Sequence, residues 1–170
     1  MPKPSELIVL ATVAAGAGGG AAIDLWTRRV PNPLTALLAA SGVLLAAYGV
    51  SGITVGASLA GLLIGLALML PGYLIGATGA GDVKLFAAVG AFIGPSPIAF
   101  AFLYTALAGG VMAIVISLWR RRLRQTLGDT ARLISTAAAN APLIESPLAN
   151  NRFAYAPAIA VGTMLAALGF

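Results

Sequence analysis

Residues 85–119 form an uninterrupted run without a single charged side chain. A membrane-spanning helix needs about 20 mostly apolar residues, so this run is longer than one helix requires. The rest of the chain is similar in character, because 59% of its 170 residues are hydrophobic and 9% are charged. Soluble domains carry about 25% charged residues, and disordered chains are poor in apolar ones. The sequence therefore excludes a water-soluble domain and a disordered chain, and it predicts an integral membrane protein of one domain, residues 1–170.

Prolines and polar residues divide the apolar sequence into segments of membrane-spanning length. Pro95-Ser96-Pro97 cuts the long run, which predicts a short helix before this motif and a longer helix after it. Pro71-Gly72 predicts a kink near the end of the third segment. The predicted fold class is an all-α, polytopic membrane helix bundle with about six transmembrane helices. The expected spans are residues 7–23, 34–50, 55–77, 82–94, 97–119 and 153–170.

Basic residues indicate the orientation of these spans. Arg28-Arg29 lies between the first and second spans, and Arg120-Arg121-Arg122 with Arg124 follows the fifth. Positively charged loops tend to remain in the cytoplasm. Six spans place both clusters on the cytoplasmic side and both termini outside. Five spans, with residues 85–119 as one helix, would put one cluster outside, so the charge pattern favours six.

The polar segment at residues 120–152 is predicted to lie on the cytoplasmic side. Leu123, Leu127, Ala131 and Ile134 recur at helical spacing among arginines, which is typical of a basic amphipathic helix on a membrane surface. An orienting loop without a further task is the simpler interpretation. The net charge of +5 comes from basic residues clustered at the ends of apolar segments. It therefore indicates membrane orientation, and no binding of nucleic acid is expected.

The first span contains a glycine-rich stretch, Gly16-Ala-Gly18-Gly19-Gly20-Ala21. Its spacing formally fits a dinucleotide-binding loop. Such a loop follows a strand in a βαβ unit, whereas this stretch lies inside a membrane segment. Small residues also allow membrane helices to approach one another closely. The stretch therefore predicts helix packing.

The chain contains no cysteine and no histidine. This excludes disulfides, thiol catalysis, zinc fingers and histidine-based proton chemistry, and no metal site is expected. Among the five acidic residues, Asp24 and Asp82 lie at boundaries of predicted spans, where a carboxylate is costly and usually functional. The orientation derived from the basic residues places both on the cytoplasmic side. Glu6, Asp129 and Glu145 lie in polar or terminal surroundings and are interpreted as surface charges.

Two carboxylates on one side of a membrane protein are typical of an aspartic dyad. When two such groups approach closely, one retains a proton, and the pair acts as general acid and general base on a shared water. This chemistry hydrolyses a peptide bond without histidine, cysteine or metal. Gly79 and Gly81 would let the backbone before Asp82 adopt a positive φ or lie close to a substrate strand.

Other interpretations of the two aspartates stay open at this point. Asp24 could pair with Arg28 and merely anchor a helix end, while Asp82 could cap the fourth helix and face Lys84. A small proton- or ion-coupled transporter or channel could use both aspartates as a relay, although no internal repeat is evident. A catalytically silent scaffold could pack through the glycine-rich first helix.

Three segments in order resemble a known family. The first runs from Asp24 through Arg28-Arg29-Val-Pro31-Asn32, and the second is Gly79-Ala-Gly81-Asp82-Val83-Lys84. The third, Tyr155-Ala-Pro157-Ala-Ile-Ala-Val-Gly162, is similar to the last helix of that family. Together they resemble the type IV prepilin peptidases, the GxGD class of membrane aspartic proteases, over essentially the whole chain.

The resemblance implies that Asp24 and Asp82 are the catalytic pair of a peptidase that uses no cofactor. It implies an enzyme of the bacterial inner membrane that cleaves the leader peptide of prepilins or pseudopilins at the cytoplasmic face, usually just after a glycine. Membrane lipid and the pilus assembly machinery are further implied partners. The motif residues expected to support the catalytic pair are Arg29, Pro31, Asn32, Gly79, Gly81 and Lys84.

The resemblance also implies a subtype. The larger, bifunctional members of the family carry an N-terminal cytoplasmic insert with paired cysteines, and they also methylate the new N-terminus. This chain lacks that insert and every cysteine. It therefore resembles the short form associated with Flp (tight-adherence) pili, and methyltransferase activity is not expected.

Overall fold

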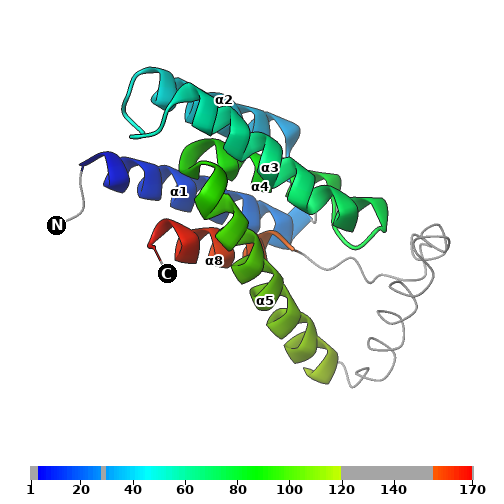
Figure 1. The fold of residues 1–170 in the computed structure, drawn as a ribbon. Coiled ribbons are helices and arrows are strands. Elements are labelled where there is room, and N and C mark those ends of the chain that lie inside the picture. The colour runs from blue at the N-terminus through cyan, green and yellow to red at the C-terminus, as the bar shows by residue number, and fades with distance from the viewer. Residues whose placement is uncertain (1–3, 28–29, 120–154, 170) are drawn as a thin grey trace.

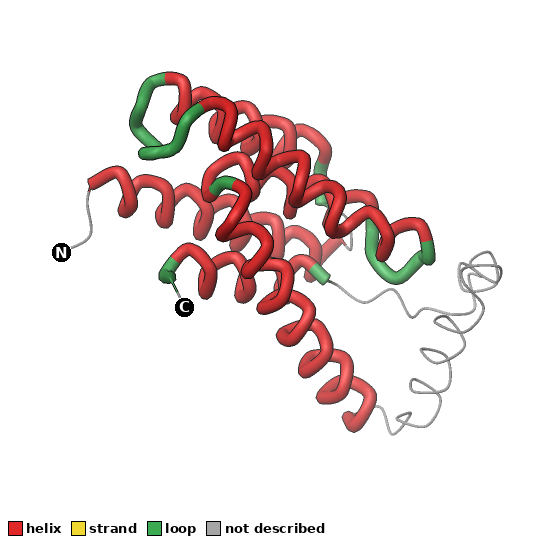
Figure 2. Tube along the Cα trace, viewed as in Figure 1, coloured by secondary structure: helices red, strands yellow, loops and turns green. Residues whose placement is uncertain are grey.

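The computed structural model describes residues 4–27, 30–119 and 155–169, which form six helices and no strand (Figures 1 and 2). This confirms the predicted all-α helix bundle. Within these residues, three helices are long and apolar enough to cross a membrane, at Leu7–Thr27, Val55–Leu74 and Pro95–Val115. The helices are α1 (Pro4–Thr27), α2 (Asn32–Ala47), α3 (Val55–Leu74), α4 (Ala80–Ile93), α5 (Pro95–Trp119) and α8 (Ala156–Ala167).

The long uncharged run is divided into α4 and α5, so the alternative of one helix over residues 85–119 is wrong. The break lies at Gly94, which ends α4 with a φ of 81°. Glycine adopts this left-handed conformation without the steric cost that a Cβ would bring, and it commonly ends helices. The predicted break at Pro95-Ser96-Pro97 is therefore misplaced slightly, because α5 already begins at Pro95. Proline is well tolerated in the first turn of a helix.

Other predicted boundaries also move, and α2 ends at Ala47, where the sequence predicted a span up to residue 50. α1 continues to Thr27, so Asp24 lies in its last turn and does not end the helix. α3 ends at Leu74, with Pro71 inside its last turn, where the sequence predicted a span up to residue 77. The predicted amphipathic segment, residues 120–152, lies outside the described residues.

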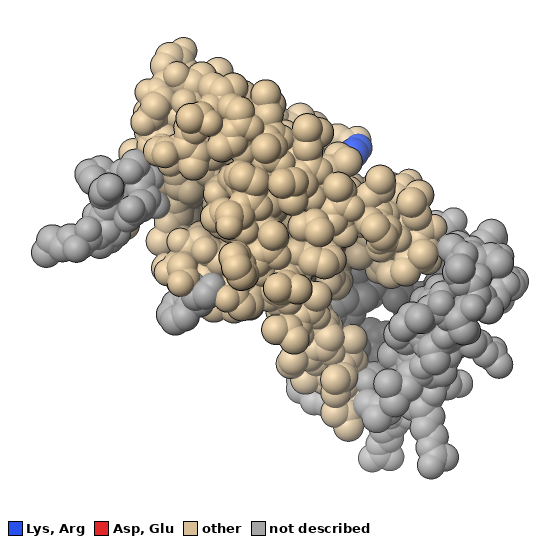
Figure 3. All heavy atoms as spheres, viewed as in Figure 1, with Lys and Arg blue, Asp and Glu red and all other residues tan. Residues whose placement is uncertain are grey.

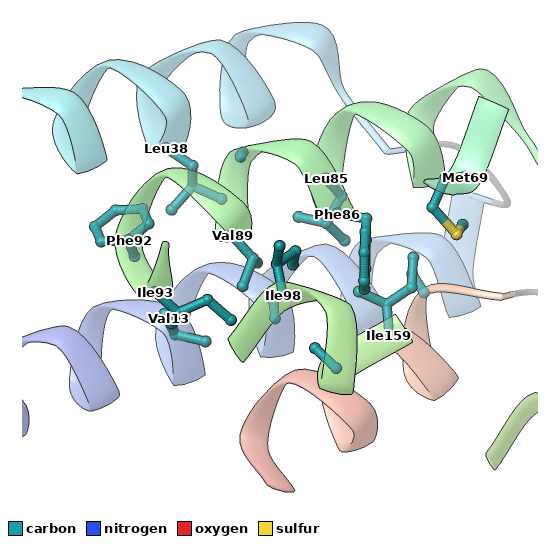
Figure 4. Packing of buried hydrophobic residues seen from close by; sticks show 14 of the residues in the cluster. Val13, Leu38, Met69, Leu85, Phe86, Val89, Phe92, Ile93, Ile98 and Ile159 are labelled. Carbon is teal, nitrogen blue, oxygen red and sulfur yellow. The ribbon is translucent and has the colours of Figure 1, made fainter. Parts of the chain in front are cut away.

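α4 is the centre of the bundle. It packs against α1, α2, α3, α5 and α8, and every residue from Leu85 to Ile93 is buried. In a membrane protein, a helix that is apolar on all sides can be covered by lipid or by protein, and α4 is covered by protein. Figure 4 shows the core side chains gathered around this helix. They include Val13 from α1, Leu38 from α2, Met69 from α3, Phe86 and Phe92 from α4, Ile98 from α5 and Ile159 from α8.

α3 and α4 cross with their backbones in direct contact. A Cβ added at Gly61 would meet the carbonyl oxygen of Gly90, and one added at Gly90 would meet the carbonyl oxygen of Gly61. One turn away, the Ser58 hydroxyl donates a hydrogen bond to the carbonyl oxygen of Ala91 at 2.7 Å. Small residues at such crossings let membrane helices gain close packing and interhelical hydrogen bonds. This crossing fixes where α4 sits in the bundle.

The glycine-rich stretch of α1 packs with two of its four glycines. Gly16 lies against the side chain of Leu38 on α2, and a Cβ at Gly20 would lie 2.9 Å from Cδ2 of Leu85 on α4. Gly18 and Gly19 have nothing within 4 Å of an added Cβ. The packing prediction is therefore right for Gly16 and Gly20 and wrong for the other two. The stretch lies inside a continuous helix, which excludes the dinucleotide-binding loop.

Candidate active site

Asp24 and Asp82 are both buried at one end of the bundle. Asp24 lies in the last turn of α1 and is 6% exposed, and Asp82 lies in the first turn of α4 and is 7% exposed. In Figure 1, the end of α1 and the beginning of α4 lie at the same side of the molecule. Burying a carboxylate is costly, so acidic residues are rarely buried to this degree without a specific task or partner.

The two aspartates come close enough for their charges to interact. The chain positions them through α1 and α4, which pack against each other. Gly20 makes the close contact of α1 with Leu85, and Asp24 follows Gly20 by four residues on the same face of the helix. The structure therefore brings together the two carboxylates that the sequence singled out.

One oxygen of Asp82 is held by the start of its own helix. The backbone N–H of Gly79 donates a hydrogen bond to Oδ2 of Asp82 at 3.1 Å. The suggestion that Asp82 caps the fourth helix is thus right for this oxygen. The other oxygen, Oδ1, is buried and has no hydrogen-bond partner within the described part of the chain. The carboxylate is therefore oriented through Oδ2, while Oδ1 remains available to a substrate, a water or a second carboxyl group.

Gly79 and Gly81 allow close packing around this carboxylate. A Cβ at Gly79 would lie 3.1 Å from Oδ2 of Asp82. A Cβ at Gly81 would lie 3.0 Å from Cβ of Val30 and 3.2 Å from its backbone N and O. Neither glycine has a positive φ, so that part of the prediction is wrong. Gly81 instead lets the Val30 segment pass directly over the first turn of α4.

The two sequence motifs also meet through side chains. The ammonium group of Lys84 donates a hydrogen bond to Oδ1 of Asn32 at 2.9 Å, across 52 positions in the chain. Lys84 therefore faces the first motif. The alternative in which Asp82 only caps the fourth helix had expected Lys84 to face Asp82. Pro31 is the N-cap of α2 in an extended conformation, so it ends the segment that connects α1 to α2. Arg28 and Arg29 lie outside the described residues.

Tyr155 is a neighbour of Asp82 to which the sequence analysis gave no role. It is the N-cap residue of α8, and its phenol group lies close enough to Asp82 for electrostatic interaction. Tyr155 opens the third family-like segment of the sequence. Its spatial position depends on how α8 packs against α1, α4 and α5, which local sequence does not reveal.

The described residues contain no group of three or more histidine, cysteine, aspartate or glutamate side chains that could hold a metal ion. The arrangement offers instead two interacting carboxyl groups, one of them with an available oxygen, next to a phenol. Such a set supports general acid–base chemistry on a water molecule.

Comparison with known proteins adds a family assignment. The model of the type IV leader peptidase family matches residues 8–114. The match contains Asp24, Asp82 and both motifs, and it ends inside α5, before Tyr155. No significant match to a curated protein or to a solved structure was found.

Proposed function

Because the chain belongs to the type IV leader peptidase family, we propose that it is an aspartic endopeptidase that removes the leader peptides of Flp-type prepilins or pseudopilins. The family match identifies the chain as a peptidase, and together with the apolar helices it identifies an integral membrane protein. It thereby disfavours the transporter and the silent scaffold. The observation that carries the aspartic mechanism is the placement of two buried, mutually interacting carboxyl groups at one end of the bundle.

In the proposed mechanism, the pair shares one proton in the resting enzyme, because two close carboxylates do not both ionise readily. The ionised member removes a proton from a water molecule, whose oxygen attacks the carbonyl carbon of the scissile peptide bond. The protonated member gives its proton to the carbonyl oxygen. Collapse of the tetrahedral intermediate breaks the C–N bond, and the departing nitrogen receives a proton from the dyad.

The contacts of Asp82 suit this task. Its Oδ2 is fixed by the Gly79 N–H, so the orientation of Oδ1 is also fixed. A reacting group must be held near its productive position, since a displacement of about 1 Å can cost on the order of 10²-fold in rate. Gly79 supports this position by having no side chain that would crowd Oδ2. The hydrogen bond between Lys84 and Asn32 joins the two motifs that contain Asp24 and Asp82.

We further propose that the chain lies in the inner membrane with its active site on the cytoplasmic side and both termini outside. The chain has no native cysteine, so single introduced cysteines can be labelled selectively. Ala77 and Ser96 are exposed, and they lie in the α3–α4 connection and at the start of α5. In intact cells, a membrane-impermeant maleimide should label Ser96→Cys, whereas Ala77→Cys should react only after the membrane is opened. Labelling of Ala77→Cys alone in intact cells would reverse this topology.

The proposed activity is tested by cleavage of a synthetic Flp-type prepilin segment with the detergent-purified chain. The segment carries the leader, the preceding glycine and the hydrophobic helix. We expect the leader to be released in the presence of a metal chelator and without S-adenosylmethionine, because two carboxylates are a poor site for a tightly held transition metal. With S-adenosylmethionine present, the new N-terminus should stay unmethylated in a mass spectrum. Chelator-sensitive cleavage restored by one specific metal would contradict the dyad mechanism.

A further inference from the structure

Tyr155 stands at the end of the bundle where the two aspartates lie. It is the N-cap residue of α8, a helix that packs against α1 and α4, which carry Asp24 and Asp82, and also against α5. Its ring is partly buried against the apolar core. Tyr155 at the start of α8, Asp24 on α1 and Asp82 on α4 thus lie in the same part of the molecule.

The ring of Tyr155 rests on a glycine of α5. A Cβ added at Gly109 would lie 2.6 Å from Cε2 of the ring, 3.1 Å from Cζ and 3.0 Å from the hydroxyl oxygen. The position of the phenol therefore depends on the missing side chain at residue 109. The next residue, Gly110, has nothing within 4 Å of an added Cβ. The tyrosine ring therefore packs against Gly109 and not against Gly110.

Tyr155 precedes α8 at the end of the bundle where α1 ends and α4 begins (Figure 1), and its phenol lies within electrostatic range of Asp82. Tyrosine is protonated at neutral pH, so this hydroxyl is a donor under ordinary conditions. A peptide carbonyl that enters beside the dyad would meet it.

We propose that Tyr155 is a substrate-contacting residue of this peptidase, whose hydroxyl, seated on Gly109, donates a hydrogen bond to the oxygen of the scissile carbonyl. This inference rests on the proposed aspartic peptidase function. As water attacks, negative charge develops on that oxygen while one aspartate transfers its proton. A second donor at the same oxygen stabilises the transition state more than the substrate, which raises the rate of the chemical step.

The central test is Tyr155→Phe, which keeps the ring on Gly109 and removes only the hydroxyl. The assay is single-turnover cleavage of the synthetic Flp-type prepilin segment, with helix melting followed in parallel and rates referred to folded protein. We expect the maximal rate to fall on the order of 10²-fold, as for loss of one donor to a developing oxyanion. The substrate concentration for half-maximal rate and the melting temperature should change little. A Phe variant with the wild-type maximal rate would overturn the inference.

A matched pair of variants tests the packing of the Tyr155 ring on Gly109. Gly109→Ala should displace the ring and slow cleavage, whereas Gly110→Ala, the same change one residue later, should leave cleavage unchanged. Adding Gly109→Ala to Tyr155→Phe should slow cleavage little further, because residues that act as one unit are not additive. Equal rates for the two alanine variants would contradict the claim that Gly109 positions the Tyr155 ring. Asp82→Asn in the same assay separates the two proposals: if it cleaves normally, the peptidase mechanism fails, and if it is inactive while Tyr155→Phe is normal, only the role of Tyr155 fails.

Discussion

We expect Asp24→Asn and Asp82→Asn each to abolish leader cleavage, with a loss of roughly 10⁴-fold, at the upper end for general acid–base groups. Asparagine keeps the size and shape of aspartate but cannot exchange a proton, so a shared-proton pair fails when either member is replaced. The double variant should be no worse than either single variant, because the two groups act as one unit. Single-turnover cleavage of a prepilin segment by purified variants measures these losses.

The same variants distinguish catalysis from a structural role. Both should still insert and fold, because removing a buried carboxylate removes a desolvation cost. If Asp24 served merely to pair with Arg28, Asp24→Asn would cost about 1 kcal/mol or less of stability and would leave cleavage intact. Asp129→Asn makes the same chemical change at a predicted surface position and serves as the control. A well-folded Asp24→Asn protein that cleaves at the wild-type rate would refute the dyad.

The second large effect is expected at the crossing of α3 and α4. In Gly61→Ala, the new Cβ would meet the carbonyl oxygen of Gly90 and would lie 2.8 Å from Cα of Gly94. These are backbone atoms, which cannot rotate away, so the two helices must separate. Overpacking a core typically costs about 1–3 kcal/mol, and we expect Gly61→Ala at or above the upper end. Cleavage should also fall, because α4 carries Asp82.

The control for this variant lies on the same helix. A Cβ at Gly56 has a single neighbour, Oγ1 of Thr54, at 3.9 Å. Gly56→Ala should therefore keep or slightly raise stability, because alanine favours a helix over glycine by about 1 kcal/mol. Unfolding in detergent, followed by circular dichroism, compares the two variants. Equal stability would mean that α3 and α4 do not cross at Gly61.

Much of the fold could be predicted because charged residues are costly in a membrane. Uncharged runs indicated the helices, and basic clusters favoured six over five. The break between α4 and α5 was harder to place. A pair of prolines looks like an interruption, yet Pro95 begins a helix, while the real turn depends on the positive φ of Gly94. Any glycine can adopt such a conformation, and the sequence does not show which glycine does so.

The candidate site was predictable to a similar degree. Asp24 and Asp82 were conspicuous as acidic residues at the ends of apolar segments. The reasons for the glycines beside Asp82 could not be predicted. Gly81 allows the close contact with Val30, and Gly79 allows the close contact with the carboxylate of Asp82. Tyr155 is similar, since its place depends on Gly109 of another helix. Contacts of this kind join distant parts of the chain and leave no periodic pattern in the sequence.

The position of α4, enclosed by other helices from Leu85 to Ile93, bears on how this enzyme can change over time. Outward-facing positions of α3 and α5, such as Leu63 and Leu107, are exposed, so selection there needs to preserve little more than apolar character. A mutation between Leu85 and Ile93 meets a neighbour in whichever direction the side chain points, and the new side chain must also match that neighbour in volume. The outward-facing positions of α3 and α5 can therefore accept many apolar substitutions, while the buried part of the helix that carries Asp82 can accept few.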